Sequence, residues 1–255
     1  MSAPTLYVFA ISHYCEKARW ALDYLRINYI LEHLPPGIHR RVAKKLGAKS
    51  SSLPILQLPD QVIQGSADIV TWAEFNKSPG TNSLNPEPGS AVNLEFDLNG
   101  MEIEKRLDDV LGVHVRRYFY SEALLDYPHT VRPIFVRDLT PIQQKLTNVT
   151  WGMIRNVMIK RMDLGHSQGL ESRQLVEQEL DWLDQLLADG RSYLNGDRFT
   201  RADITAASLL APLVRPEEHP TYAHIELSPN VAVDCAAWRA RRCMQWAKEL
   251  YRKYR

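Results

Sequence analysis

A serine and a cysteine stand three residues apart where a predicted strand gives way to a predicted helix. The apolar, β-branched and aromatic run Thr5 to Ala10 is typical of a buried strand, and a helical pattern starts at Ser12 in Ser12-His13-Tyr14-Cys15. Free amide groups and the helix dipole at such a start stabilise a thiolate. A serine there cannot form a disulfide, but its hydroxyl can donate a hydrogen bond to a thiolate of another molecule. The alternative function of Ser12 is to cap the helix.

Cys15 is the second candidate nucleophile, because a helix start lowers the pKa of a thiol. The chain has three cysteines, Cys15, Cys235 and Cys243. So few cysteines, and an odd number, favour a reducing compartment over a disulfide framework, which predicts a cytoplasmic protein. Cys15 has no partner cysteine, so we interpret it as packed and inert and keep a reactive Cys15 as an alternative.

A third candidate is the Gly-x-Ser-x-Gly pattern of Gly165-His166-Ser167-Gln168-Gly169, which matches the nucleophile elbow of α/β-hydrolases. An elbow needs a preceding central strand, whereas Pro141 to Met162 has a helix-like pattern. The sequence therefore predicts a glycine-punctuated loop between two helices, with Ser167 at the surface.

Metal binding and a substrate pocket give weaker patterns. The eight histidines are scattered, with no Cys/His pair at metal-ligand spacing, so no metal is predicted. Arg116, Arg117, Tyr118 and Tyr120 lie on one predicted helix. Arginines in a pocket would favour anionic or polar substrates, and a solvated helix face is the alternative.

The elements that must position these residues divide the chain into two unlike parts. After the first strand and helix, Asn28 to Leu34 reads as a strand and Ile38 to Leu46 as a helix. Leu53 to Leu58 and Gln61 to Ile63 form a predicted hairpin, after which Ser66 can cap another helix. The order is β-α-β-α-β-β-α.

The remainder of the chain is helical in pattern. Residues 76 to 90 hold three prolines and two glycines with almost nothing to bury, which is typical of an interdomain connection. Helical spacing follows over Asn93 to Tyr120, Pro141 to Met162, Leu170 to Leu187 and from Val231 onward. Thr200 and Asp203 form a capping box, so we assign Asp203 to folding.

Composition excludes several classes of function. Of the 255 residues, 45% are hydrophobic and 24% are charged, a composition typical of globular proteins. The length corresponds to one or two domains. A net charge of +1 is too small for a general nucleic-acid binder. Because no apolar run is long enough to span a bilayer, no membrane partner is expected.

Several motifs together resemble a known family. The first domain resembles the thioredoxin superfamily, with Ser12 in place of the leading cysteine of the glutaredoxin pattern Cys-Pro-Tyr-Cys. The pair Leu53-Pro54, the serine Ser66 and the segment from Leu194 to Ile204 extend the likeness across essentially the whole chain. The chain as a whole resembles the serine-type glutathione transferases.

The resemblance implies an α+β thioredoxin-like domain at 1–76, a linker at 77–90 and an all-α helical-bundle domain at 91–255. It implies that Ser12 activates the thiol of the cofactor glutathione for attack on a small-molecule electrophile, in a homodimer. Leu53 would pair with glutathione through its backbone next to a cis peptide bond at Pro54, and Ser66 would hold the γ-glutamyl carboxylate. Gly65 replaces the usual Gln, Glu or Asp beside that serine, and Lys49 or Arg40 would lie near the glycyl carboxylate.

Two other functions remain open at this point. A glutathione-dependent thiol reductase would use Cys15. A non-catalytic ligand-binding or scaffold protein would keep the fold and lose glutathione, which Gly65 favours.

Overall fold

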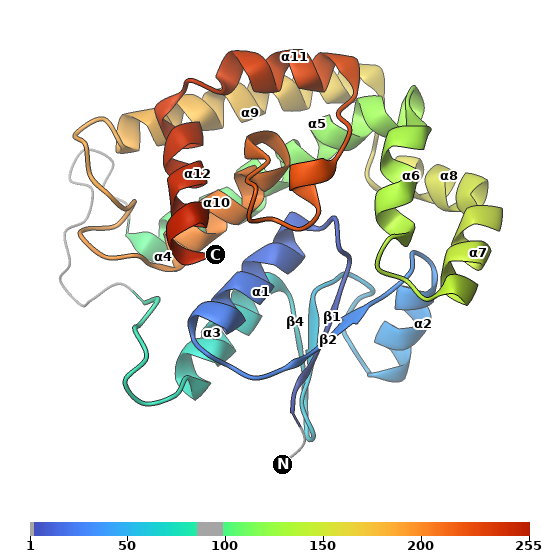
Figure 1. Ribbon diagram of the computed structural model, residues 1–255, viewed down its shortest axis with the longest axis horizontal. Coiled ribbons are helices and arrows are strands. Elements are labelled where there is room, and N and C mark those ends of the chain that lie inside the picture. The colour runs from blue at the N-terminus through green and yellow to red at the C-terminus, as the bar shows by residue number, and fades with distance from the viewer. Residues whose placement is uncertain (1–2, 86–98) are drawn as a thin grey trace.

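The computed structural model describes residues 3–85 and 99–255, which form a small mixed sheet with its helices and a larger helical part (Figure 1). The first part contains β1 (Thr5–Val8), α1 (His13–Tyr24), β2 (Ile30–His33), α2 (Ile38–Lys45), β3 (Ile55–Gln57), β4 (Val62–Gln64) and α3 (Ser66–Asn76). The second contains α4 (Gly100–Arg106), the π-helical turn η1 (Leu107–Leu111), α5 (Gly112–Leu125), α6 (Pro128–Val136), α7 (Pro141–Val149), α8 (Trp151–Arg161), α9 (His166–Leu186), α10 (Arg201–Val214), the 3₁₀ turn η2 (Tyr222–His224), α11 (Pro229–Trp238) and α12 (Arg242–Tyr254).

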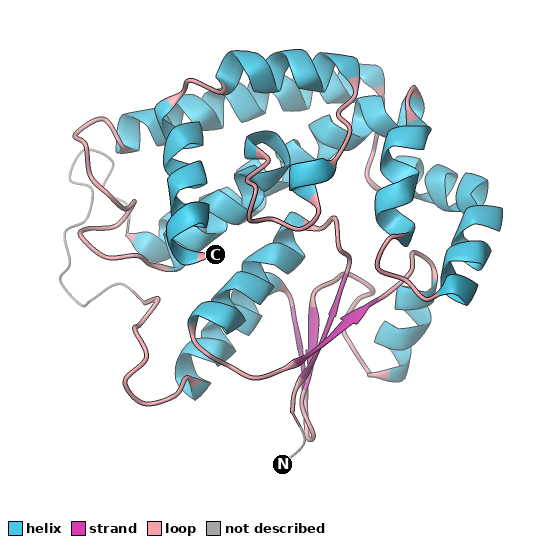
Figure 2. Cartoon of the chain, in the orientation of Figure 1, coloured by secondary structure: helices cyan, strands magenta, loops and turns pink. Residues whose placement is uncertain are grey.

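The strands lie in the order β2-β1-β3-β4, and all of those in the described residues belong to the first part (Figure 2). β1 pairs in parallel with β2 and antiparallel with β3, which pairs antiparallel with β4. Leu6 and Val8 are fully buried in β1. α1 and α3 lie on one side of the sheet and α2 on the other (Figure 1). This is the predicted βαβαββα order and the thioredoxin-like fold.

The helical part is built around α10, whose residues from Arg201 to Leu213 are all buried. Asp203 is fully buried, and its carboxylate accepts the amides of Leu194 and Thr200, each at 2.7 Å. The predicted capping role of Asp203 is confirmed, because these bonds join the preceding loop to the first turn of the helix.

Three predicted helical stretches differ from the structure at their boundaries. The stretch 141–162 is broken at Thr150 into α7 and α8, and the C-terminal stretch is broken into α11 and α12. The helix expected from Leu170 starts four residues earlier, at His166. Hydrophobic periodicity continues through a tight turn between two packed helices, so it marks a break poorly.

The two parts are joined by a buried cluster of charges. Lys17 of α1 is fully buried, with its Nζ 2.8 Å from Glu104 of α4 and 2.5 Å from the Asp108 carboxylate in η1. Arg201 also binds Glu104 and donates to the Ala67 carbonyl of α3 at 3.2 Å. These contacts hold α1 and α3 against the helical part.

The connection after α3 lies partly outside the described residues. Leu84 is buried: its amide donates to Glu74 at 2.9 Å and its carbonyl accepts from Arg201 at 2.8 Å. Residues 86–90 of the predicted linker, and the expected start of the next helix at Asn93, lie outside the described ranges. In the part that the structure describes, no helix is both long and apolar enough to cross a bilayer.

Candidate functional site

Ser12 is the N-cap of α1, and its side chain also reaches a cavity. Its Oγ accepts a hydrogen bond from the Cys15 amide at 3.3 Å, and the residue lines the cavity that separates the two parts of the chain. Since the cap uses a lone pair on Oγ, the hydroxyl proton stays available to a ligand. The capping and the thiol-binding interpretations of Ser12 are therefore compatible.

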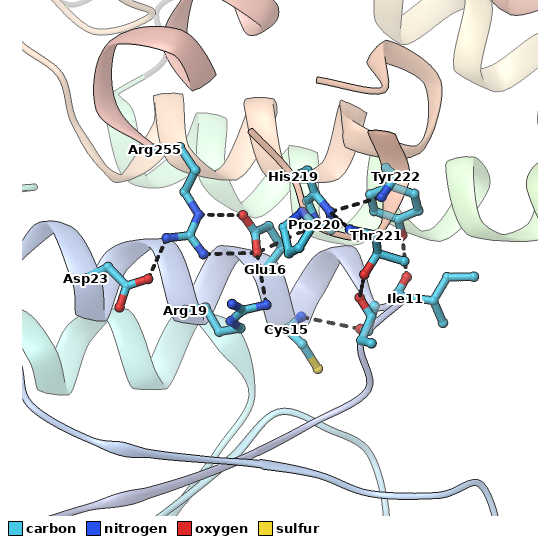
Figure 3. A network of polar contacts seen from close by, with 12 residues as sticks. Ile11, Cys15, Glu16, Arg19, Asp23, His219, Pro220, Thr221, Tyr222 and Arg255 are labelled. Carbon is cyan, nitrogen blue, oxygen red and sulfur yellow. Dashed lines mark hydrogen bonds and ion pairs between the residues drawn. The ribbon is translucent and has the colours of Figure 1, made fainter. Parts of the chain in front are cut away.

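The backbone just before Ser12 is clamped by a loop of the helical part (Figure 3). The Thr221 hydroxyl donates to the Ala10 carbonyl at 3.1 Å, and the Tyr222 hydroxyl donates to the Ile11 carbonyl. Tyr222 is 1% exposed and also lines the cavity. This loop holds Ser12 at the cavity wall, and no pattern in the sequence indicated it.

His219 lies in the same loop and organises its backbone (Figure 3). Its Nδ1 accepts the amides of Thr221 and Tyr222, both at 3.1 Å, so the proton of the neutral ring is on Nε2. Nε2 lies 3.7 Å from Glu16 of α1, which also binds Arg255 at 2.7 Å. Burial lowers the pKa of His219 to about 4, so the ring is neutral at physiological pH.

Another part of the cavity wall is the segment that leads into β3. The Leu53–Pro54 peptide bond is cis, as the resemblance implied, and Leu53 lines the cavity. The backbone amide and carbonyl of Leu53 form no hydrogen bond with any described residue. Gln64 braces this segment, because its side chain bonds the backbone of Ser50 and Ser52 at 2.8 to 2.9 Å. Like the loop that holds Ser12, Gln64 positions part of the cavity wall, and no pattern in the sequence predicted this role.

The start of α3 adjoins Pro54. The Gly65 amide donates to the Pro54 carbonyl at 3.1 Å, which places the start of α3 beside the Leu53 segment, but Pro54, Gly65 and Ser66 do not themselves line the cavity. The expectation that Ser66 caps this helix is wrong: Gly65 is the N-cap, and Ser66 is the first helical residue. Gly65 has a φ of 101°, a conformation that a glycine adopts without strain. The buried Ser66 lies among the free amides of the first turn.

The cavity has a volume of about 410 Å³ and extends from Ser12 into the helical part. Its lining is mostly apolar and comes from the segment after β1 and from α1, α2, α5, α6 and α8, with Phe9, Phe119, Phe135, Met153, Ile154 and Met158 among its residues. This size and character suit a small organic molecule.

The basic candidates lie at different places around this cavity. Arg40 and Arg116 line it, with Arg40 exposed and Arg116 half-buried. Lys49 is exposed and is not part of the lining. Of the aromatic residues near Arg116, Tyr120 lines the cavity, while Tyr118 instead donates to Asp234 at 2.5 Å.

The two alternative nucleophiles are poorly placed for reaction. Cys15 is 1% exposed, and burial raises the pKa of its thiol to about 11, so it carries almost no thiolate at neutral pH. The segment 165–169 is not the predicted loop, because α9 begins at His166. Ser167 is exposed, and α8 rather than a strand precedes the segment. The geometry of a nucleophile elbow is therefore missing.

Within the described ranges, no group of three or more His, Cys, Asp or Glu side chains could hold a metal ion. The polar groups that line the cavity include hydroxyls, guanidinium groups and the imidazoles of His13 and His39.

Solved structures with this fold include glutathione S-transferases and a beta-etherase. A glutathione transferase from Phanerochaete chrysosporium is 17% identical over 100% of this chain and 98% of its own, with a TM-score of 0.65. A glutathione S-transferase from Methylobacillus flagellatus with glutathione bound is 18% identical over 96% of this chain and 98% of its own (TM-score 0.53). A beta-etherase from a Sphingobium species is 17% identical over 97% and 99% (TM-score 0.57).

Family comparison gives the same relationship from sequence. No protein with a curated description matches the chain. Residues 6–81 match the glutathione S-transferase N-terminal domain and residues 169–247 match the glutathione S-transferase C-terminal domain, which together span more than half of the chain. With both domains present in order and the fold to match, the chain belongs to the glutathione S-transferase superfamily.

Proposed function

We propose that this protein is a glutathione transferase that uses Ser12 to activate the thiol of glutathione. The carrying observation is the half-buried Ser12 Oγ, which accepts from the Cys15 amide and keeps its own proton for a ligand in the cavity. Donation of that proton to sulfur stabilises the thiolate over the thiol. The thiol proton leaves to solvent, the thiolate sulfur forms a bond to an electrophilic carbon, and the leaving group departs with the electron pair of its own bond.

The residues on the cavity wall, and those next to it at the start of α3, fit glutathione as a substrate. The unpaired backbone of Leu53, next to the cis bond at Pro54, supports antiparallel pairing with the cysteinyl unit. The free amides and the hydroxyl of Ser66 support binding of the γ-glutamyl carboxylate at the α3 N-terminus. Arg40 on the cavity wall is better placed than Lys49 for the glycyl carboxylate. The Methylobacillus relative, crystallised with glutathione, is consistent with this assignment.

The reductase alternative has no support from the site. Cys15 is buried, does not line the cavity and has a raised pKa. The scaffold alternative is decided by whether glutathione binds, which calorimetry measures directly.

The domain division and the assembly are part of the proposal. We propose domains at 1–76 and 91–255, with the connection 77–90 between them, and a homodimer. The end of α3 offers Phe75, which is 82% exposed, as an apolar contact for a second copy. Light scattering on the purified chain measures the mass, and a monomer would contradict the dimer.

The test of the chemistry is the pKa of the bound glutathione thiol, read from thiolate absorbance against pH. A charge-assisted hydrogen bond contributes about 1.5 to 3 kcal/mol, which corresponds to roughly one to two pKa units. We expect Ser12→Ala to keep much of the glutathione affinity, to raise the pKa of the bound thiol by this amount and to slow turnover near neutral pH.

A second variant separates the hydroxyl from the cap. Glycine caps a helix almost as well as serine, whereas alanine loses about 1 kcal/mol. Ser12→Gly should therefore raise the pKa of the bound thiol as much as Ser12→Ala does, with a smaller loss of melting temperature. Cys15→Ala is the control for the buried thiol. If both Ser12 variants leave the pKa and turnover unchanged while Cys15→Ala abolishes activity, the Ser12 mechanism is refuted.

A further inference from the structure

The charges that line the cavity all have one sign. The lining includes Arg40, Arg116 and Arg161 and no aspartate or glutamate of the described residues. Most of the remaining lining is aromatic or aliphatic, including Phe119, Phe135 and Met158. A charged group in such a low-dielectric enclosure favours a partner of opposite charge.

Arg116 differs from the other two arginines in its position. Arg40 and Arg161 are exposed, whereas Arg116 is half-buried, on the α5 face that also presents Phe119 and Tyr120 to the cavity. Its Nε is shielded from solvent without a hydrogen-bond partner, and its guanidinium forms no ion pair with any described residue. A guanidinium that lines the cavity and has no ion-pair partner within the protein can bind a carboxylate through the nitrogens that face the cavity.

The neighbouring arginine on the same helix shows what a structural role looks like. Arg117 binds Asp163 at 2.9 Å and Glu171 at 3.1 Å, and it does not line the cavity. Of two adjacent arginines on α5, one is neutralised within the protein and the other is not.

We propose that Arg116 binds a carboxylate on the second substrate, so that the preferred electrophile is an apolar or aromatic compound carrying an anionic group. The apolar walls contact the body of the molecule, and Arg116 fixes the end that bears the charge. This inference rests on the proposed function, because it places the electrophile in the part of the cavity beyond Ser12.

The test compares two unreactive aromatic probes that differ by a carboxylate, 3,5-dinitrobenzoate and 1,3-dinitrobenzene, by calorimetry on the full chain. We expect the wild type to bind the benzoate at least tenfold more tightly, in line with one charge-assisted hydrogen bond. In Arg116→Leu this preference should be lost through weaker benzoate binding, with the affinity for 1,3-dinitrobenzene changed less than twofold. Arg116→Lys should keep part of the preference, and the control Arg117→Leu should keep all of it.

Three outcomes would overturn the proposal. One is equal binding of the two probes by the wild type, and another is a preference that Arg161→Leu removes but Arg116→Leu does not. The third is a loss of glutathione affinity in Arg116→Leu as large as the loss for benzoate, since Arg116 would then bind glutathione itself. Wild-type calorimetry with glutathione alone tests the proposed function separately, so a protein that ignores glutathione but prefers the benzoate refutes only that function.

Discussion

Replacing Lys17 with methionine tests how the two parts of the chain are held together. Lys17 is fully buried, and it neutralises Asp108 at 2.5 Å and shares Glu104 with Arg201. In Lys17→Met, Glu104 keeps Arg201, but the Asp108 carboxylate loses its ion-pair partner. Its side chain is only 17% exposed, so water replaces that partner poorly.

The expected loss is large because one buried charge stays uncompensated. Breaking a buried pair by removing one partner costs about 3 to 5 kcal/mol. At about 2 to 4 °C per kcal/mol for a chain of this size, that lowers the melting temperature by roughly 6 to 20 °C. Burial already raises the pKa of Asp108, and without Lys17 it rises further. A group with a raised folded-state pKa destabilises more as pH rises above its unfolded value, so the deficit of the variant should shrink toward acidic pH.

Thermal and urea unfolding across a pH series measure this deficit. The matched control is Lys105→Met, which breaks the ion pair of Lys105 with Asp109, where the side chains are 77% and 59% exposed. We expect no measurable change there, because solvent and salt screen an exposed pair. Lys17→Met combined with Asp108→Asn should recover most of the lost stability. If Lys17→Met melts like the wild type, or if the double variant is less stable than the single one, the reasoning is refuted.

Two further predictions concern buried polar residues that do not line the cavity, His219 and Asp203. Because burial lowers the pKa of His219 to about 4 from 6.5, its stabilising contribution is complete above pH 6.5 and is lost as pH falls toward 4. The free energy of unfolding of the wild type should therefore fall by up to about 3 kcal/mol relative to that of His219→Gln over that window. Urea unfolding of both proteins at each pH measures this difference. The contributions of titrating groups that both proteins share, such as Asp203, cancel in it. Asp203→Ala leaves the amides of Leu194 and Thr200 without their acceptor, so it should lower the free energy of unfolding by about 1 kcal/mol or more. Glutathione affinity, measured by calorimetry, should stay unchanged. A normal melting temperature with abolished turnover would instead place Asp203 in the site.

Much of the local structure could be predicted because its signals are local. The strand at Thr5–Val8, the helix from His13 and the hairpin ending in Gln64 follow from side-chain period and turn residues. The capping box of Thr200 and Asp203 could be recognised because its two residues lie only three positions apart. The Leu53-Pro54 pair was informative only through the family resemblance, because hydrophobic periodicity alone cannot indicate that a backbone segment binds a ligand.

The surroundings of Ser12 were decided by tertiary structure alone. The loop at His219, Thr221 and Tyr222 lies more than two hundred residues from Ala10 and Ile11, and no pattern in either segment predicts their hydrogen bonds. The low reactivity of Cys15 likewise follows from burial, which raises the pKa of its thiol against the effect of the helix start.

The sequence by itself determined the order of the elements in the first domain, the family and Ser12 as the residue at the helix start. Only the tertiary structure distinguished Arg116 from Arg117, adjacent in sequence and equal in charge. A helix turns about 100° per residue, so one side chain lines the cavity while the next meets Asp163 and Glu171. Which side chain keeps its charge for a ligand depends on what packs against each face of that helix, and those neighbours come from distant parts of the chain.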